Sequence, residues 1–332
     1  MKRKAEPKPS TSSSRSARTG RGQVGLHESA GSLDDLYQTV GVIGRGNFAE
    51  INLLKKREGG ELFALKTCCK LDALSYAHLR KEAVLMQPLR HNFLLTPVQV
   101  VDSRGRAASF SVLLELCPGG DLLQLLRRQP EGRLQPAAAA RFCAMIVLGL
   151  EALHEAGLAY RDLKPENLFL RANGYVRLAD FGLAAPLAEC DTTQVGTALY
   201  QAPELVRKQA HGPGVDWWAL GVLLVEMLSG SSPFAAAADQ AADQASSEEA
   251  THAAILEHVG GVPASVAADA LPADAALLIA ALLQPDAAQR LGVRSLCDRA
   301  YDMNSVHVCG AYTCDVRVCA CVPVCLCACV PV

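Results

Sequence analysis

The sequence lacks any uninterrupted run of about 20 apolar residues, the length that a membrane-crossing helix needs. The final apolar stretch starts at Val318 and contains Pro323 and Pro331, which interrupt helices. The first residues contain no apolar segment of the kind found in signal peptides. We therefore expect a protein without a membrane span, located in the cytoplasm, with the nucleus as the alternative.

The body of the chain has no Cys-x-x-Cys pair. Eight of the 13 cysteines lie beyond residue 296, and the other five are scattered. We therefore expect free thiols in a reducing compartment. Residues 301–332 form a Cys/Val-rich low-complexity tail, whose thiolates would suit zinc or copper(I). A dinucleotide repeat in the gene encodes the same pattern, and we favour an artefact of the gene model as its explanation.

Acidic residues are almost absent from the first 23 positions, where seven lysine and arginine residues accompany only Glu6. This segment is also rich in Ser, Thr, Gly and Pro and has no apolar run. We interpret residues 1–35 as a disordered basic arm. A solvated tail is favoured over a contact with nucleic acid or membrane, so no nucleic-acid partner is expected.

The character of the chain changes near residue 117. Residues 36–117 carry strand-like segments separated by glycine-containing turns and one amphipathic helix over residues 77–86. Helical patterns dominate residues 118–300, around short strands. We predict an α+β fold with two lobes, a small β-rich N-lobe and a larger, mainly helical C-lobe. Residues 235–254 contain almost no large apolar side chain, so we expect a flexible low-complexity insertion in the C-lobe.

A glycine-rich segment lies between two of the predicted strands. It consists of Gly44, Arg45, Gly46, Asn47, Phe48 and Ala49. Small residues allow backbone amides to approach phosphate oxygens, so this segment is a candidate phosphate-binding loop. One strand later, Lys66 stands in an otherwise apolar stretch and needs an anion. Glu82 on the predicted helix is the candidate partner. Taken alone, the glycine-rich segment is more often only a turn, and an ordinary salt bridge on a half-buried face is the alternative for Lys66 and Glu82.

Four polar residues with complementary chemistry lie further along the chain. Asp162 and Lys164 belong to the run Tyr-Arg-Asp-Leu-Lys-Pro-Glu-Asn, which ends at Asn167, and Asp180 begins Asp-Phe-Gly. Phosphoryl transfer requires a carboxylate at the attacking hydroxyl, a cation near the transferred group and oxygen ligands for Mg²⁺. Asp162 meets the first need, Lys164 the second, and Asn167 with Asp180 the third. A turn-capping role would explain Asp162 alone, but not all four positions together.

In these motifs and their order, residues 36–292 resemble the catalytic domain of eukaryotic serine/threonine protein kinases. Glu204 and Arg290 resemble a structural ion pair of that family, and the run that starts at Asp216 resembles its buried central helix. This run and Tyr160 are similar to the basophilic, AGC-type group, and within it to cAMP- and cGMP-dependent kinases. The resemblance implies a bilobal fold and an enzyme that uses ATP and Mg²⁺ to phosphorylate Ser/Thr hydroxyls of protein substrates.

The resemblance also assigns residues to the nucleotide site. Lys66, held by Glu82, would contact the phosphates, and Asp121 would bind the ribose. The adenine would lie between apolar side chains and meet the backbone of the segment that joins the lobes. These adenine contacts are Ile51, Ala64, Leu114, Phe169, and the backbone of Glu115 and Cys117. Plain core packing is the alternative for each apolar residue.

Substrate binding is assigned by the same resemblance. Asp121, Glu166 and Glu226 would form an acidic surface for arginines that precede the phosphorylated residue. Thr197, near the end of the activation segment, would also contribute to substrate binding. The expected partners are therefore basic protein substrates with Ser or Thr acceptors.

Regulation is implied by Arg161, directly before the candidate base. A guanidinium group in this position calls for an anion, which a phosphorylated loop residue can supply. The family spacing makes Thr193 the expected phosphothreonine, with Thr192 as the competing acceptor. His78 would complete the phosphate site and link it to Glu82. An upstream activating kinase or a separate regulatory subunit is therefore an expected partner.

The chain departs from the family pattern at several positions. Ala49 replaces the third loop glycine, and Ala185 stands where related kinases often place a lysine that binds the loop phosphate. Gln194 and Gln201 replace apolar residues around the pocket for the residue after the phosphoacceptor, which argues against a hydrophobic preference there. No phenylalanine follows Phe234, so we expect the aromatic docking tail to be missing or supplied by another protein. The alternative to an active kinase is a pseudokinase or scaffold that binds nucleotide and partners without catalysis.

Overall fold

The structure of the chain is a computed structural model that describes residues 33–46, 49–69, 71–103, 108–235, 243–266 and 271–292. The expectations for Asn47, Phe48, the Cys/Val-rich tail and nearly all of the basic arm fall outside the described residues. The described residues form two groups of elements, one built on a β-sheet and the other mainly helical.

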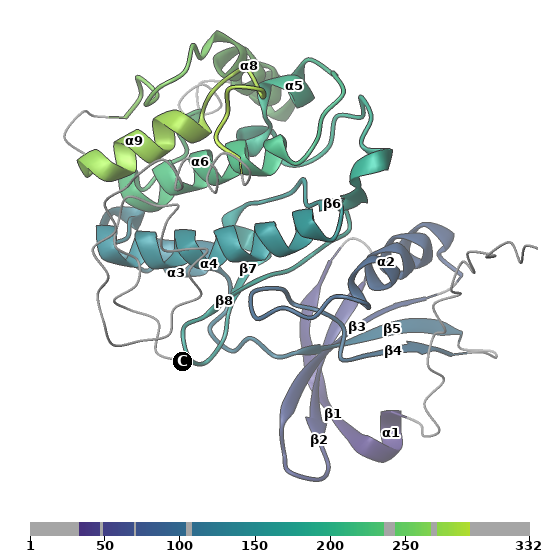
Figure 1. Cartoon of the computed structure of the whole chain (residues 1–332). Coiled ribbons are helices and arrows are strands. Elements are labelled where there is room, and N and C mark those ends of the chain that lie inside the picture. The colour runs from purple at the N-terminus through teal and green to yellow at the C-terminus, as the bar shows by residue number, and fades with distance from the viewer. Residues whose placement is uncertain are drawn as a thin grey trace, which may run out of the picture.

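A five-stranded antiparallel sheet forms the N-terminal part of the molecule (Figure 1). Its strands, in the spatial order β1-β2-β3-β5-β4, are β1 (Tyr37–Arg45), β2 (Glu50–Lys56), β3 (Leu62–Cys69), β5 (Ser109–Glu115) and β4 (Gln99–Asp102). The short helix α1 (Leu33–Leu36) precedes the sheet, and α2 (Ala73–Met86) packs on β3 and β5. Helix α2 begins four residues earlier than its apolar pattern indicates. The Asp72 carboxylate accepts hydrogen bonds from the amides of Leu74 and Ser75 and thereby caps this first turn.

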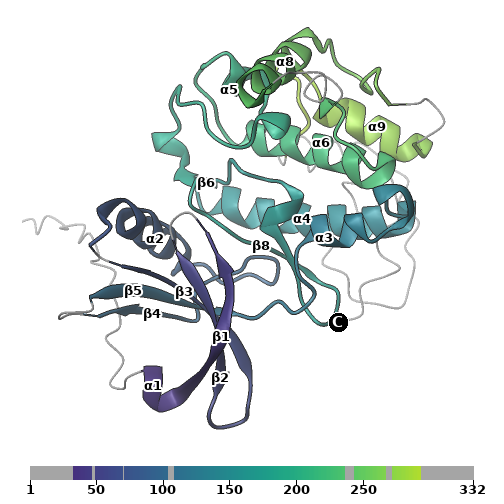
Figure 2. The ribbon, with the colours of Figure 1, turned by 180° about the vertical axis from the view of Figure 1, so that it is seen from behind.

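The C-terminal part is mainly helical, and Figure 2 shows it on the other side of the β5–α3 connection. Its helices are α3 (Leu122–Arg127), α4 (Pro136–Glu155), α5 (Pro203–Val206), α6 (Gly214–Ser229), α8 (Gln244–Glu257) and α9 (Ala273–Leu282). Its short strands are β6 (Leu158–Ala159), β7 (Leu168–Leu170), β8 (Val176–Leu178) and β9 (Ala185–Pro186). The described residues of this part also include four 3-10 turns: Pro130–Gly132, Pro165–Asn167, Leu187–Glu189 and Ala198–Tyr200.

Helices α4 and α6 form the centre of the larger core. Helix α6 is buried along nearly its whole length, and Trp218 in it stacks on Phe234 with ring centroids 6.0 Å apart. Among the described residues, α4 is the one helix long and apolar enough to cross a membrane. Nine of its residues are buried, and it packs on α6 and β8. Its apolar character is therefore explained by its place in the core.

Helix α8 corrects the prediction of a flexible insertion over residues 235–254. The Asp243 carboxylate accepts a 2.8 Å hydrogen bond from the Ser246 amide and caps the helix. Thr251 and Ile255, four residues apart, are buried on the face that packs against α5 and the 3-10 turn Ala198–Tyr200. Two well-placed side chains are enough to anchor a helix, although the composition of the segment is mostly Ala, Gln, Asp, Glu and Ser. Residues 236–242 of the predicted insertion lie outside the described part.

The arrangement confirms the predicted α+β fold with a β-rich N-terminal part and a helical C-terminal part. Helix α6 contains the run that starts at Asp216, and it is buried as the sequence predicted. Residues 116–121 join the end of β5 to the start of α3 and connect the two parts (Figure 1).

Candidate active site

A cavity of about 630 Å³ lies between the sheet and the helical part. This volume is in the range of small-molecule and cofactor sites. Ten residues that the sequence assigned to nucleotide binding line it: Arg45, Gly46, Ala49, Ile51, Ala64, Lys66, Leu114, Glu115, Cys117 and Phe169. Gly44 pairs with Ile51 across β1 and β2, next to this lining, and Asp121 forms a β-bridge with Phe169. The site residues of the sheet and of the helical part thus meet in one place.

Several lining residues were not indicated by any motif. They are Ile43, Leu79, Leu95, Leu116 and Ala179. All five are apolar, and apolar residues in strands and helices are usually core residues. The sequence therefore offers no local signal that separates them from the core.

Lys66 and Glu82 form the predicted ion pair. The Lys66 Nζ lies 2.7 Å from Glu82 Oε2 and 3.7 Å from Asp180 Oδ1. Burial acts to lower the pKa of Lys66, but the carboxylates of Glu82 and Asp180 outweigh it, so the pKa is raised. Lys66 therefore stays protonated inside the cavity, as a phosphate ligand must.

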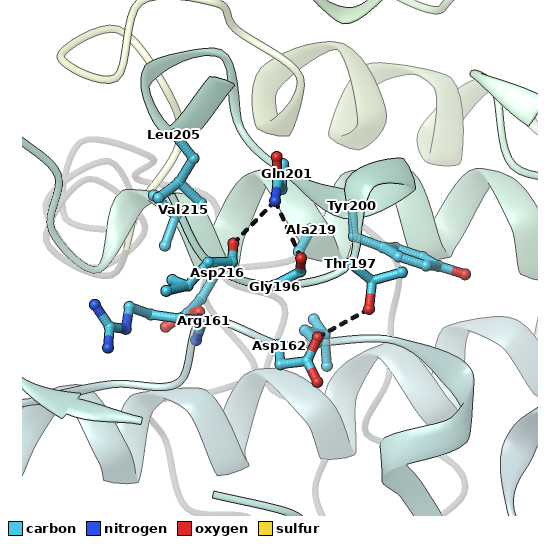
Figure 3. Close-up of a pocket in the computed structure, with 12 residues that line it drawn as sticks. Arg161, Asp162, Gly196, Thr197, Tyr200, Gln201, Leu205, Val215, Asp216 and Ala219 are labelled. Carbon is cyan, nitrogen blue, oxygen red and sulfur yellow. Dashed lines mark hydrogen bonds between the residues drawn. The ribbon is translucent and has the colours of Figure 1, made fainter. Parts of the chain in front are cut away.

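Asp162 is the centre of a tight polar cluster. Asn167 Nδ2 donates hydrogen bonds of 2.8 Å to both the carboxylate and the carbonyl oxygen of Asp162. Lys164 Nζ lies 2.9 Å from Asp162 Oδ2. The Thr197 hydroxyl donates to Asp162 Oδ1 at 3.1 Å and accepts from Lys164 at 2.8 Å, and the first of these contacts is drawn in Figure 3. The carboxylate is thus held by three side chains, and Asp162 is buried and lines a small cavity that it shares with Arg161 and Thr197.

Asp216 holds the backbone that precedes Asp162, a role that the local sequence pattern did not indicate. It is fully buried, and its two carboxylate oxygens accept the backbone amides of Tyr160 and Arg161 at 2.9 and 2.7 Å. His154 Nε2 lies 2.8 Å from the same carboxylate. Arg161 adopts a positive φ of 69°, a conformation that costs energy for residues other than glycine. The Asp216 contacts hold the backbone in this conformation just before Asp162.

Asn167 and Asp180 are the candidate metal ligands. The Asn167 amide nitrogen is engaged by Asp162, which leaves its oxygen as an acceptor, and both residues line the cavity. An amide oxygen and a carboxylate are hard ligands that suit Mg²⁺, which typically binds few protein groups together with substrate phosphates. Within the described residues, no group of three or more His, Cys, Asp and Glu side chains could hold a metal ion. The donor set fits Mg²⁺ that is shared with a bound phosphate.

The three carboxylates predicted to bind arginines have different environments. Asp121 caps α3 by accepting the Gln124 amide at 2.8 Å. Glu226 accepts a 2.5 Å hydrogen bond from the Tyr200 hydroxyl, and burial together with the nearby Glu166 carboxylate raises its pKa despite that bond. Glu166 is exposed and lines the cavity. Glu166 and Glu226 therefore act on one another electrostatically, whereas Asp121 also has a structural role.

The residues predicted to regulate the site lie in separate places. Thr193 is exposed, and its amide donates to Asp191 Oδ1 at 2.8 Å. Arg161 Nε donates to the Leu183 carbonyl at 2.8 Å, and its NH1 is 3.4 Å from His211 Nε2, a neighbour that no motif indicated. His78 lines the 630 Å³ cavity with Glu82, four residues away on the same face of α2, as its spacing predicts. Arg161 instead lines the small cavity beside Asp162.

Glu204 and Arg290 form the predicted structural ion pair. Two hydrogen bonds of 2.7 and 2.9 Å join the guanidinium to the carboxylate, and both residues are buried. The pair connects α5 to the segment that follows α9. Arg290 also lies 5.3 Å from the Trp218 ring centre, so it is held between a carboxylate and an aromatic face.

Fold and site together define the two-lobed kinase class: a nucleotide-sized cavity between a β-sheet and a helical part, with a paired lysine and a clamped aspartate. Residues 37–301 match the protein kinase domain family, and the chain belongs to this family. Members of the family generally use ATP and Mg²⁺. The predicted family is therefore confirmed.

Curated relatives support the closer placement. The chain is 36% identical over 233 residues to the cAMP-dependent protein kinase catalytic subunit PRKX of Mus musculus, over 69% of this chain and 60% of that protein. It is 34% identical over 265 residues to the cAMP-dependent protein kinase, catalytic subunit-like of Caenorhabditis elegans, over 79% of this chain and 61% of that protein. The predicted resemblance to AGC-type kinases is confirmed by these relatives. The chain spans about 60% of their length.

Proposed function

We propose that this chain is an active protein serine/threonine kinase that transfers the γ-phosphoryl group of ATP to Ser or Thr hydroxyls of protein substrates. One observation carries the proposal. Lys66, Asn167 and Asp180 line the same cavity, and Asn167 holds the Asp162 carboxylate beside it by a 2.8 Å hydrogen bond. All groups that phosphoryl transfer needs are therefore assembled in one place.

Each side chain has a role in the proposed transfer. The acceptor hydroxyl lies against the Asp162 carboxylate, which takes its proton while the hydroxyl oxygen bonds to the γ-phosphorus. The bond from that phosphorus to the oxygen of the β-phosphate breaks, and ADP leaves. Lys66 orients the phosphates, and Lys164 places positive charge near the transferred group. Mg²⁺ held by Asn167 and Asp180 would neutralise charge on the phosphate oxygens.

We propose basic substrates for the same site. Glu166 and Glu226 bring negative charge to one surface, and Asp121 adds a third carboxylate at the rim of the nucleotide cavity. Arginine side chains bind carboxylates in bidentate fashion, which favours substrates with arginines before the acceptor.

Control by phosphorylation is a further part of the proposal. An upstream kinase would phosphorylate the exposed Thr193, and the phosphate would bind the Arg161 guanidinium. A regulatory subunit is the other expected partner.

We also propose a cytoplasmic location, because the five cysteines of the described residues are free thiols, as in a reducing compartment. A fluorescent fusion found outside the cytoplasm and nucleus would contradict this location.

The Asp162→Asn substitution tests the activity. The amide cannot accept the hydroxyl proton as a base, so kcat should fall by at least ~100-fold, as expected when general-base assistance is lost. Purified wild-type protein and the variant would be assayed with ATP, Mg²⁺ and a basic Ser/Thr peptide.

The matched control is Asp274→Asn, the same exchange at an exposed position in the first turn of α9. Its kcat should equal that of the wild type. Equal, background-level turnover by the wild type and Asp162→Asn would contradict the proposal and favour the pseudokinase or scaffold.

A further inference from the structure

Three polar side chains from two distant parts of the chain meet beside the Asp162 cluster. Gln201 is 6% exposed, and its Oε1 lies 2.9 Å from Gln194 Nε2 and 3.0 Å from His252 Nε2. Gln194 precedes Thr197, and His252 belongs to α8. We call Gln194, Gln201 and His252 the polar triad. The segment with the expected flexible composition thus delivers a side chain to the activation segment.

The hydrogen bonds fix which atoms of the polar triad donate. Gln201 Nε2 donates to the carbonyl oxygens of Val195 and Gly196 at 3.2 and 3.0 Å, contacts that Figure 3 shows. Its Oε1 can therefore only accept, so Gln194 Nε2 and His252 Nε2 both carry the hydrogens that face it. The 3.4 Å contact between these two nitrogens then joins two donors and is not a hydrogen bond. A neutral His252 then presents its Nδ1 as an acceptor, and Gln194 presents Oε1 as another. Within the described part of the chain, neither of these two atoms has a hydrogen-bond partner.

The polar triad is close to where a phosphoacceptor would lie. Gln201 and Asp162 line the same small cavity, together with Thr197, whose hydroxyl contacts Asp162. A substrate hydroxyl that reaches Asp162 must approach beside Thr197. An extended peptide advances roughly 3.3 Å per residue, so a neighbour of the acceptor residue passes the segment from Gln194 to Gln201. Gln194 and His252 are only partly buried and are accessible to it.

We propose that the polar triad is a specificity subsite that selects a hydrogen-bond donor in the substrate residue adjacent to the phosphoacceptor. Two acceptors without partners favour an amide or hydroxyl side chain. An apolar substrate side chain would displace water from both acceptors and could not replace the hydrogen bonds that the water made. A substrate carboxylate has acceptor oxygens only, so it could not donate a hydrogen bond to either acceptor. The inference rests on the proposed kinase activity and specifies its substrates further.

Peptides with Asn, Leu or Asp on either side of one Ser acceptor test this subsite. The three side chains have nearly the same size and differ in hydrogen bonding, and kcat/KM would be measured for each with the full-length chain. We expect Asn to exceed both Leu and Asp by about tenfold at one of the two positions, as the loss of one hydrogen bond predicts. The family resemblance makes the residue after the acceptor the expected position.

Two variants connect any preference to the polar triad. Gln194→Met and His252→Leu should each bring the Asn/Leu ratio to about one or below. The ratio is taken within one protein, so the folded fraction cancels. Gln209→Met makes the same exchange at an exposed residue three positions beyond α5, and it should keep the wild-type Asn/Leu ratio.

The outcomes separate the subsite from the activity. Transfer with a preference for Leu or Asp over Asn at both positions, or a ratio that Gln194→Met and His252→Leu leave unchanged, overturns the subsite alone. Transfer to every peptide no faster than by Asp162→Asn overturns the proposed kinase activity, and the subsite with it.

Discussion

Single residues in the cleft have their chemistry set by what surrounds them. Lys66 keeps its charge because two carboxylates offset its burial, whereas the same burial suppresses ionisation of the Cys117 thiol in the segment that joins the two parts. In the same cavity, the surroundings thus keep Lys66 charged and keep the Cys117 thiol protonated.

Cys117 should react slowly with alkylating agents. Burial, with a contribution from the Glu115 carboxylate, raises the pKa of the Cys117 thiol to about 11. At pH 8 its reactive thiolate should be about 100-fold scarcer than for an ordinary cysteine. Iodoacetamide labelling followed by peptide mass spectrometry would measure this, with the exposed Cys69 in the same protein as the control. Alkylation of Cys117 at the rate of Cys69 would contradict the raised pKa of the Cys117 thiol.

Thr197 should position the base rather than bind nucleotide. Its hydroxyl bridges Asp162 and Lys164, so Thr197→Val, which keeps the shape, should lower kcat about tenfold. Thr197→Ser keeps the hydroxyl and should restore most of the rate. The KM for ATP should stay the same in both variants. A loss shared equally by Thr197→Val and Thr197→Ser would assign the residue to packing.

At the level of elements, short contacts decide where helices begin and end. Helix α6 ends at Gly230, whose φ is 89°, and an added Cβ would lie 2.3 Å from the Glu131 carbonyl oxygen. Helix α4 is followed by Gly157, with a φ of 76° and open space around the Cβ position. The two glycines share a backbone conformation and differ in their surroundings.

Alanine at these two glycines should separate strain from collision. Gly157→Ala should cost ~1 kcal/mol of unfolding free energy, the usual penalty of a left-handed conformation. Gly230→Ala carries the same penalty and forces the Glu131 backbone to move, which should add ~1–3 kcal/mol. Urea unfolding of both variants would measure the difference. Equal losses of unfolding free energy in the two variants would show that the Glu131 backbone moves away from the added methyl group at no cost.

Helix α8 is the element whose position depends most on packing. Its buried Thr251 and Ile255 hold it against α5, and this position brings His252 to Gln201. The sequence pattern of the segment carries little apolar signal. The position of α8 against α5 and the contact of His252 with Gln201 therefore both follow from tertiary structure.

For the whole molecule, the proposed control of the cleft by phosphorylation of Thr193 is the main hypothesis to test. The Arg161 backbone amide donates to Asp216, and Thr193 is exposed further along the chain. A phosphate on Thr193 would give Arg161 a charged partner and order the loop on the Asp162 cluster.

Thr193→Ala should lower kcat/KM roughly tenfold or more in protein treated with an activating kinase, because charge-assisted hydrogen bonds to Arg161 are lost. Thr192→Ala, at the preceding exposed position, is the matched control and should keep the wild-type rate. Phosphate incorporation at each site would be located by mass spectrometry. Full activity of phosphorylated Thr193→Ala would show that this switch does not operate.

The sequence by itself determined the family, the two-part fold and most of the residues assigned to nucleotide binding that line the cavity. These features depend on contiguous motifs: Asp162, Lys164 and Asn167 lie within six residues, and Lys66 and Glu82 within one strand and one helix. Local spacing is enough to place such groups, because a short loop or a helical turn leaves them few alternative positions.

Tertiary structure alone decided the contacts between distant segments. Asp216 reaches the backbone of Tyr160 and Arg161 across more than 50 residues, and His252 reaches Gln201 across a similar separation. A buried aspartate or a partly exposed histidine has no local periodicity that reveals its partner. The partner is chosen by how α6 and α8 pack, which is a property of the folded core and not of any single segment.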